Sequence, residues 1–336
     1  ILFVSGGDLW EIDAVSGSLL QITTSAALEF GPAVSRDGRI AYSEYGSAKD
    51  LYVVSLEERS HERLTSHTGG QNQNARISPD GTRIVYDSVR TGDREIWVID
   101  RGTGSETRLA SHPASDSFPS WSPDGKQVAF LSLRDGEAAL WVANADGSGG
   151  PRRLTAEHVG FGAGHLRWSP DGAAIGFLGA SERGPALYEL DLATGSVTLR
   201  KYGVETFGWY LDREHVVYTP TARDSAGRME MRVVNFRTGK EDVLLEEPHT
   251  ELIVAQDGTA VAYCRAASHF AMQLYYLKLR PPSPKSVDGL PTPEGQPVQL
   301  TDGDYHVHNG GWSPDGKEIV YTRATDEGNI YVIEPR

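Results

Sequence analysis

The stretch WSPDGKQVAF, from Trp121 to Phe130, decides the fold, because near-copies of it recur along the chain. The copies are ISPDGTRIVY from Ile77, WSPDGAAIGF from Trp168 and WSPDGKEIVY from Trp312. In each copy Pro presets φ for a turn, Asp can bond to its own backbone, and Gly accepts a positive φ. The β-branched and aromatic run that follows is typical of a strand. The stretch is therefore a repeated turn followed by a strand.

The glycine of this turn gives the period of the repeat. Six glycines follow an Asp in the pattern: Gly38, Gly81, Gly125, Gly172, Gly258 and Gly316, with gaps of 43, 44, 47, 86 and 58 residues. A degenerate copy, WYLDREHVVY from Trp209, divides the gap of 86. An insertion, RPPSPKSVDGLPTPEG at about residues 280–295, lengthens the last gap. A period in the low forties is typical of a four-stranded propeller blade.

Further strand-like runs complete each repeat. Third strands are predicted at EIWVID (95–100) and ALWVAN (139–144), and fourth strands at HERLT (61–65) and PRRLT (151–155). No stretch has a long helical period. A single blade cannot bury its own faces, whereas a ring of blades covers them. We therefore expect an all-β chain, a single β-propeller over residues 1–336 built of four-stranded antiparallel blades, with the repeated Trp or Ile packed between blades.

The two ends of the chain leave the number of blades open. Residues 1–23 align as the second, third and fourth strands of a repeat, and residues 308–336 align as the first, second and third. There are thus eight central hairpins but seven inner strands. The hairpins favour eight blades, with residues 1–23 in a sheet of their own. In the alternative there are seven blades, and SLLQIT (18–23) closes the last one by pairing with NIYVIE (329–334).

Charge and composition exclude several classes of partner. The chain has 32 Lys and Arg against 46 Asp and Glu, a net charge of −14. Nucleic acids and anionic membranes both need a basic surface, so neither is expected as a partner. No apolar run approaches the roughly 20 residues of a membrane span. The lone cysteine, Cys264, excludes an intrachain disulfide, and its strand-like surroundings indicate a small core residue.

The SPDG turn, the strand after it and the closing RLT resemble the WD-like propeller repeat of the TolB and tricorn-type family. The opening ILFVSGGDLWEIDAVSG (1–17) resembles a tricorn-type first blade. The resemblance covers nearly the whole chain except the insertion. It implies a non-catalytic module that binds or scaffolds a protein, peptide or small ligand without a cofactor, and a periplasmic or secreted location. Alternatively, it implies the gating propeller of a tricorn- or oligopeptidase-like peptidase, although no GxSxG motif is present.

The repeat is also similar to that of oligogalacturonate lyase, whose propeller channel holds a metal through His and Gln residues. The stretch HVHNGGWSPDG supplies His306 and His308 just before an inner strand, but this H-x-H is one residue out of step with the family pattern. The alternative function is therefore a metal-dependent lyase or hydrolase. Its divalent transition metal is expected at His165, His306 and His308, because imidazole suits such ions.

Strand order places the starts of all inner strands at one mouth of the channel. Three residues before the Trp position, successive repeats carry Gly31, Asn74, Phe118, His165, Thr206, Glu251 and Asn309. We expect ligand contacts from Asn74, Asp116, Glu251 and Asn309. The nearby Glu29, Gln71, Gln73, Glu205 and Asp304 add to an acidic mouth suited to a cationic ligand, or they simply solvate a water-filled channel.

Overall fold

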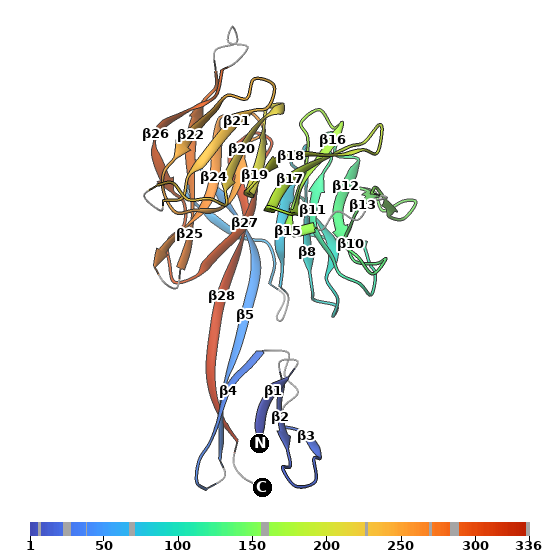
Figure 1. Ribbon diagram of the computed structural model, residues 1–336, viewed down its shortest axis with the longest axis vertical. Helices are drawn as coiled ribbons and strands as arrows, with labels where there is room; N and C mark the ends of the chain where they lie inside the picture. Colours follow the sequence, from blue (N-terminus) through green and yellow to red (C-terminus); the bar gives the residue numbers. More distant parts are fainter. Residues whose placement is uncertain are drawn as a thin grey trace. The chain divides into compact units, whose positions relative to one another are not determined.

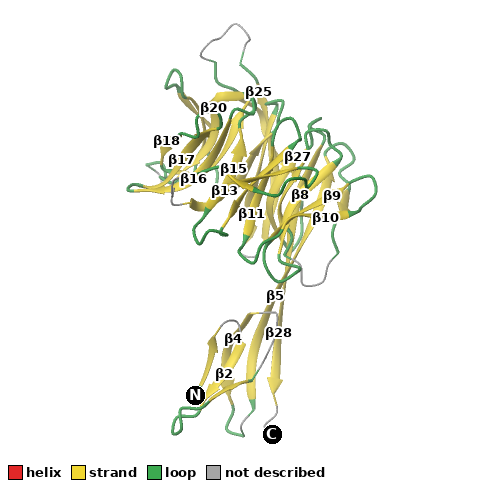
Figure 2. Cartoon of the chain, turned by 90° about the vertical axis from the view of Figure 1, so that its right-hand side faces the viewer, coloured by secondary structure: helices red, strands yellow, loops and turns green. Residues whose placement is uncertain are grey.

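The computed structural model of the chain describes residues 1–5, 8–22, 28–37, 39–66, 71–155, 161–225, 228–268, 271–282 and 289–333. Throughout these ranges the chain consists of strands joined by turns and loops (Figure 2). The prediction of an all-β chain is confirmed. Within the same ranges there is no helix with the length and apolar character needed to span a membrane.

The chain divides into two compact units: residues 1–49 with 324–336 form unit 1, and residues 50–323 form unit 2. The strands β5 (Ile40–Ser55) and β28 (Glu318–Ile333) contribute residues to both units. The sequence predicts a single propeller in which loops at 45–49 and 324–328 fold each of these segments into a hairpin. Instead both segments are continuous strand, and β5 pairs with β28. The backbone hydrogen bonds that each segment would make within its own hairpin are instead made between β5 and β28.

Unit 1 contains a three-stranded sheet in the order β1 (Leu2–Ser5), β2 (Asp8–Ile12) and β3 (Leu19–Gln21). The strand β4 (Leu28–Val34) pairs with the first part of β5. The prediction that residues 1–23 form strands in a sheet of their own is confirmed. Among the described strands SLLQIT does not pair with NIYVIE, since β3 is the edge strand of its sheet and has β2 as its neighbour.

Unit 2 contains five complete four-stranded antiparallel sheets among its described residues. Their strands, in chain order, are β7 (Gln73–Ile77), β8 (Arg83–Ser88), β9 (Glu95–Asp100) and β10 (Glu106–Ala110); β11 (Asp116–Trp121), β12 (Gln127–Ser132), β13 (Ala139–Asn144) and β14 (Arg152–Arg153); β15 (Phe161–Trp168), β16 (Ala174–Ser181), β17 (Gly184–Asp191) and β18 (Val197–Tyr202); β19 (Val204–Tyr210), β20 (Asp212–Pro220), β21 (Met231–Asn235) and β22 (Glu241–Leu245); and β23 (Thr250–Val254), β24 (Ala260–Ser268), β25 (Ala271–Arg280) and β26 (Thr292–Gln299). The predicted insertion falls between β25 and β26, and its residues 283–288 lie outside the described ranges.

A sixth blade combines both ends of unit 2. Its strands are β27 (His306–Trp312), the first part of β28, the second part of β5 and β6 (His61–Arg63). The inner strands of the six described blades neighbour one another in the order β7, β11, β15, β19, β23 and β27, and β27 lies beside β7. The predicted counts of eight or seven blades are therefore not confirmed. The opened hairpins of β5 and β28 remove strands that the repeat count assigns to separate blades.

Apolar side chains fill the space between consecutive blades. In the described part of unit 2, each of six core clusters joins one blade to the next. The cluster that closes the ring places Leu51, Val53 and Val320 of the sixth blade against Ile77 and Ile84 of the first. Figure 1 follows this order by colour, from cyan at β8 through green at β12 to orange at β24. Each blade is therefore stabilised by apolar burial against its neighbours.

The repeated tryptophans connect four of the six described blades to the blade that precedes each of them. The Trp121 indole Nε1 donates to the Arg76 carbonyl oxygen at 3.0 Å, and the Trp312 Nε1 donates to the Ile253 carbonyl oxygen at 3.0 Å. Two further bonds of this kind run from Trp168 to Ser120 and from Trp209 to Arg167, each at 3.2 Å. The predicted packing of these residues between blades is confirmed.

The SPDG turn is held by its own side chains. The Ser122 hydroxyl donates to the Asp124 carboxylate at 2.7 Å, and the backbone amide of Lys126 donates to the same carboxylate at 3.0 Å. These hydrogen bonds, from Ser122 first, hold the pKa of Asp124 below its usual value. Gly125 completes the turn with a φ of 69°. Corresponding bonds occur in the turns at Ser78, Ser169 and Ser313.

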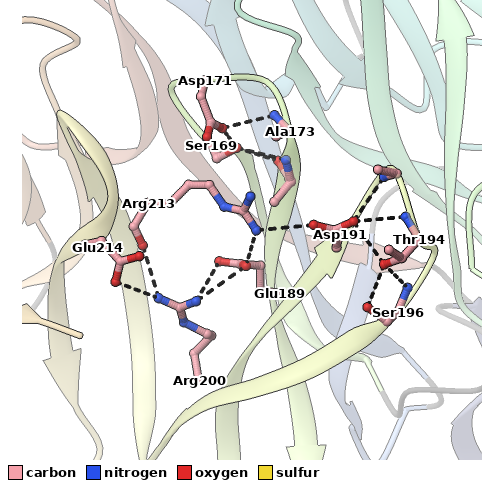
Figure 3. Close-up of polar contacts among 12 residues, drawn as sticks. Ser169, Asp171, Ala173, Glu189, Asp191, Thr194, Ser196, Arg200, Arg213 and Glu214 are labelled. Carbon is pink, nitrogen blue, oxygen red and sulfur yellow. Dashed lines mark hydrogen bonds and ion pairs between the residues drawn. The ribbon is translucent and has the colours of Figure 1, made fainter. Parts of the chain in front are cut away.

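The degenerate repeat exchanges this turn for an ion-pair network, shown in Figure 3. Arg213 stands where the other repeats have glycine. Its guanidinium lies 2.5 Å from the Glu189 carboxylate and 3.6 Å from that of Asp191, both on β17 of the preceding blade. Arg200 of β18 lies 3.4 Å from the same Glu189 carboxylate. Charged contacts therefore support this blade-to-blade interface, in addition to apolar packing.

Replacing Gly125 by Val is expected to destabilise the protein by roughly 1–3 kcal/mol, because a β-branched residue is strained at positive φ. A Cβ at this position would meet the Pro79 Cδ at 3.7 Å, an ordinary contact, so strain rather than collision is the cause. Thermal or denaturant unfolding measures the effect. Lys126→Val, at the exposed neighbouring position, is the matched control. Equal stability of the two variants would show that the turn tolerates a side chain.

Candidate binding cavity

A cavity of about 300 Å³ lies where the inner strands of unit 2 end. Every inner strand contributes to its wall, and so do several of the loops that follow those strands. The lining residues include Ile77, Ser120, Gly208, Ile253, Val254, Ala255, Gln256 and Gly311. A cavity shared by all inner strands lies on the axis of the ring, where one ligand can touch every blade.

Much of the cavity wall comes from the repeated motif itself. The indoles of Trp121, Trp168, Trp209 and Trp312 line it, together with the turn prolines Pro79, Pro123 and Pro170. Each indole that lines the cavity also donates its N–H to a neighbouring blade, which fixes the ring in place. Rigid aromatic and proline surfaces bind apolar groups at a low cost in conformational entropy.

The only charged side chains among the lining residues are Arg76 and Arg167. They occupy equivalent positions, one residue before the motif's Ile77 and Trp168. An Arg76 terminal nitrogen donates to the carbonyl oxygens of Ala75 at 2.7 Å and Gly310 at 2.6 Å. An Arg167 terminal nitrogen donates to the Leu166 carbonyl oxygen at 2.8 Å. Backbone carbonyls thus hold both guanidinium groups in place.

Burial lowers the pKa of both the Arg76 and the Arg167 guanidinium groups. Burial lowers the pKa of Arg76 to about 10, while the negative charges of Glu251 and Asp87 act in the opposite direction. Burial also lowers the pKa of Arg167 well below its usual value, and the positive charge of Arg76 lowers it further. The two guanidinium groups are therefore poorly solvated, and the charge of Arg76 acts on Arg167.

Two predicted ligand residues have polar partners within the protein. The Asn74 amide donates to the buried Asp87 carboxylate at 2.7 Å. The Asp116 carboxylate is fully buried and pairs with the Arg134 guanidinium at 2.8 Å. Of the predicted site residues whose side chains are described, none lines the cavity, because all lie toward the starts of the inner strands. The side chain of Asn309 falls outside the described part of the structure.

Three predicted residues do approach one another near the strand starts. The His308 Nδ1 lies 3.5 Å from a Glu251 carboxylate oxygen, and the rings of His306 and His308 stack with centroids 6.0 Å apart. Glu251 has a φ of 54° at a point where the pairing of β23 with β24 shifts register. Such a bulge re-aims a side chain away from the regular pleat.

His165 lies apart from that pair, with its ring centroid 6.4 Å from the ring centroid of Phe118. Burial lowers the pKa of His165 to about 3, and the positive charge of Arg167 adds to the effect. Its imidazole is therefore neutral at neutral pH, the form that binds metals. The described residues contain no group of three or more His, Cys, Asp or Glu side chains placed to share a metal ion.

The sequence predicts a site at the starts of the inner strands, whereas the cavity lies at their ends. The arginines that line it stand immediately before the motif, and two basic residues at one repeat position were the available signal. The ring fold and its cavity define unit 2 as a β-propeller with a cavity lined by its inner strands. Residues 12–166 match the family model described as the TolB β-propeller domain. The predicted resemblance is confirmed over residues 12–166, which are similar to TolB-type propeller repeats.

Curated relatives and solved structures agree with this conclusion. A TolB homologue of Chlorobium luteolum is 26% identical, over 26% of this chain and 30% of the relative. The Tol-Pal system protein TolB of Anaeromyxobacter dehalogenans is 33% identical, over 34% of this chain and 27% of the relative. The matches thus span less than a third of these relatives' length.

Two structures share the fold. The structure of putative TolB from Agrobacterium tumefaciens has a TM-score of 0.64 at 17% identity, covering 83% of this chain and 99% of that one. Oligogalacturonate lyase from Vibrio parahaemolyticus has a TM-score of 0.52 at 14% identity, covering 94% and 95%. At these identities the likeness concerns the fold alone.

The lowered pKa of His165 predicts a loss of stability in acid. As pH falls below about 6.5, an unfolded histidine binds a proton that the native state does not bind until about pH 3. The free energy of unfolding should therefore fall across this range, and His165→Gln should lose less of it. Thermal unfolding of both proteins from pH 7 to 3.5 measures the difference. Parallel curves would contradict the assignment, as would an NMR titration of His165 near pH 6.5.

Proposed function

We propose that unit 2 is a binding module, and that its central cavity receives a segment of a protein or peptide partner. The observation that carries the proposal is the cavity of about 300 Å³ lined by all six described inner strands and four indoles. Pockets with an apolar and aromatic wall and a few polar groups are typical ligand sites. The volume suits one or two side chains of a partner.

The resemblance to TolB supports the choice of a protein partner. Relatives carry the name Tol-Pal system protein TolB, which places those proteins in a multi-protein system. By the same resemblance, we assign this chain to the periplasm or to the secreted proteins. The net charge of −14 is consistent with a role that does not involve nucleic acid.

The rim of the cavity offers a test with a matched control. Leu211 lines the cavity and is 44% exposed, whereas Leu133 is equally exposed but does not line it. Asn suits the Leu211 backbone, whose φ is 62°, because Asn tolerates the left-handed region. For peptides selected by phage display on the full chain, we expect Leu211→Asn to weaken binding several-fold to tenfold, through lost apolar contact.

Leu133→Asn should leave the same peptides bound as tightly as the wild type. Binding should also change the tryptophan fluorescence, because four of the seven tryptophans line the cavity. Calorimetry and fluorescence measure both effects. Peptides that bind Leu211→Asn unchanged and leave the fluorescence unaltered would place the binding site elsewhere and overturn the proposal.

A second candidate function, a metal-dependent lyase or hydrolase, draws on His306, His308 and Glu251, whose side chains would have to move in order to share one ion. Two stacked imidazoles beside a carboxylate supply donors that a divalent transition metal accepts. In this proposal His165 contributes a neutral imidazole from another inner strand. The fold shared with oligogalacturonate lyase is compatible with such a site but does not assign it.

Calorimetric titration with Mn²⁺ and Zn²⁺ tests the second candidate. We expect saturable binding that is lost in a double His306→Ala and His308→Ala variant and weakened by His165→Ala, because each removes a ligand. His61→Ala, on the outer strand β6, is the control and should bind as the wild type does. No saturable binding, or binding that survives both sets of substitutions, would remove the metal from consideration.

A further inference from the structure

The charge of the cavity wall is opposite to that of the chain. The chain carries a net charge of −14, yet the only charged residues lining the cavity are two arginines. Solubility accounts for the net negative charge of the chain, but it does not account for two arginines that line a cavity inside the ring. A negatively charged group from outside the chain would compensate the positive charge of these arginines.

The protein itself pairs these arginines with carbonyls rather than with carboxylates. Arg76 donates to two backbone oxygens, and its Nε is buried without a hydrogen-bond partner. Arg167 donates to the carbonyl oxygen of its own neighbour, Leu166. Among the described residues, neither guanidinium forms an ion pair within 4.0 Å. Donors of both groups therefore remain free for a ligand.

The nearest carboxylates are committed elsewhere. Asp87 pairs with Arg94 and accepts the Asn74 amide. Glu251 lies against His308 and acts on both cavity arginines only through longer-range attraction. Neither cavity guanidinium therefore has a carboxylate within ion-pair distance among the described residues. A cation left unpaired inside a protein is costly, so its persistence points to a partner that arrives from outside.

We propose that the cavity binds a carboxylate-bearing group of its partner, with Arg76 and Arg167 as the anion ligands and the indoles enclosing the apolar part. The proposal rests on the proposed function and specifies its chemistry. Guanidinium groups form charge-assisted hydrogen bonds with carboxylates. The tryptophan and proline wall suits an apolar group attached to that carboxylate, as in a peptide's last residue or an acidic side chain.

Two probes that differ only in charge test the proposal: N-acetyl-L-phenylalanine and its amide. We expect the acid to bind at least roughly tenfold more tightly than the amide, the usual gain from a hydrogen bond to a charged group. Tryptophan fluorescence and calorimetry report the affinities. Glutaric acid monobenzyl amide, which carries its carboxylate on a chain resembling that of Glu, separates a side-chain carboxylate from a C-terminal one. Inorganic phosphate is the competing anion.

Arg167→Met is the decisive variant, because Arg167 makes a single local hydrogen bond. We expect it to reduce binding of the acid to the level of the amide while leaving the amide unchanged. Arg183→Met, at an exposed arginine on the same blade, is the control and should keep the tenfold preference. Without ligand, Arg167→Met should melt no lower than the wild type, since it removes a buried charge that lacks an ionic partner.

The outcomes separate this proposal from the function on which it rests. Equal binding of acid and amide would overturn the carboxylate site and leave the cavity as a neutral binding site. If the selected peptides bind less tightly to Leu211→Asn but neither probe binds, the carboxylate site is likewise overturned and the cavity remains a neutral binding site. Phosphate binding that depends on Arg167, without binding of the acids, would identify a different anion. A lower melting temperature of Arg167→Met would show that the protein already satisfies this arginine, and would overturn the proposal.

Discussion

Each blade of unit 2 is a sheet with two apolar faces, and only another blade can cover them. The six described clusters between blades meet this need, and the tryptophan N–H bonds to the carbonyls of the preceding blade fix the distance between neighbours. Because the bond starts from the same motif position in each of four repeats, the indoles converge on the axis. The constraint that closes the ring thus also builds the aromatic wall of the cavity.

The local chemistry of the repeat could be predicted from the sequence, since the turn at Gly125 and the strand to Phe130 depend on neighbouring residues. The packing role of Trp121 followed from its recurrence. The number of blades could not be predicted in the same way. It depends on whether segments such as 40–55 fold back as a hairpin or pair with the other end of the chain, and both arrangements satisfy the same strand propensities.

The candidate site was predicted only in part. His306, His308 and Glu251 were expected to gather, and His308 does lie beside Glu251. Asn74 and Asp116 were expected at the same mouth of the channel, but they bind Asp87 and Arg134, partners that no spacing rule reveals. Arg76 and Arg167 were not predicted as site residues, because a basic residue beside a buried motif is usually interpreted as the solvent-exposed end of a strand. Burial and the lack of an ionic partner are properties of three-dimensional packing.

The sixth blade has a consequence for the order of events during synthesis. Its inner strand β27 and the first part of β28 come from the last residues of unit 2, whereas β5 and β6 are made before all the other blades. Until the final segment has been made, Leu51, Val53 and Ile77 lack the Val320 that completes their cluster. A growing chain therefore carries an uncovered apolar face and an unpaired strand edge at its first blade, features that favour aggregation and chaperone binding. A chain that terminates before β27 and β28 cannot form the sixth blade, and its ring therefore cannot close.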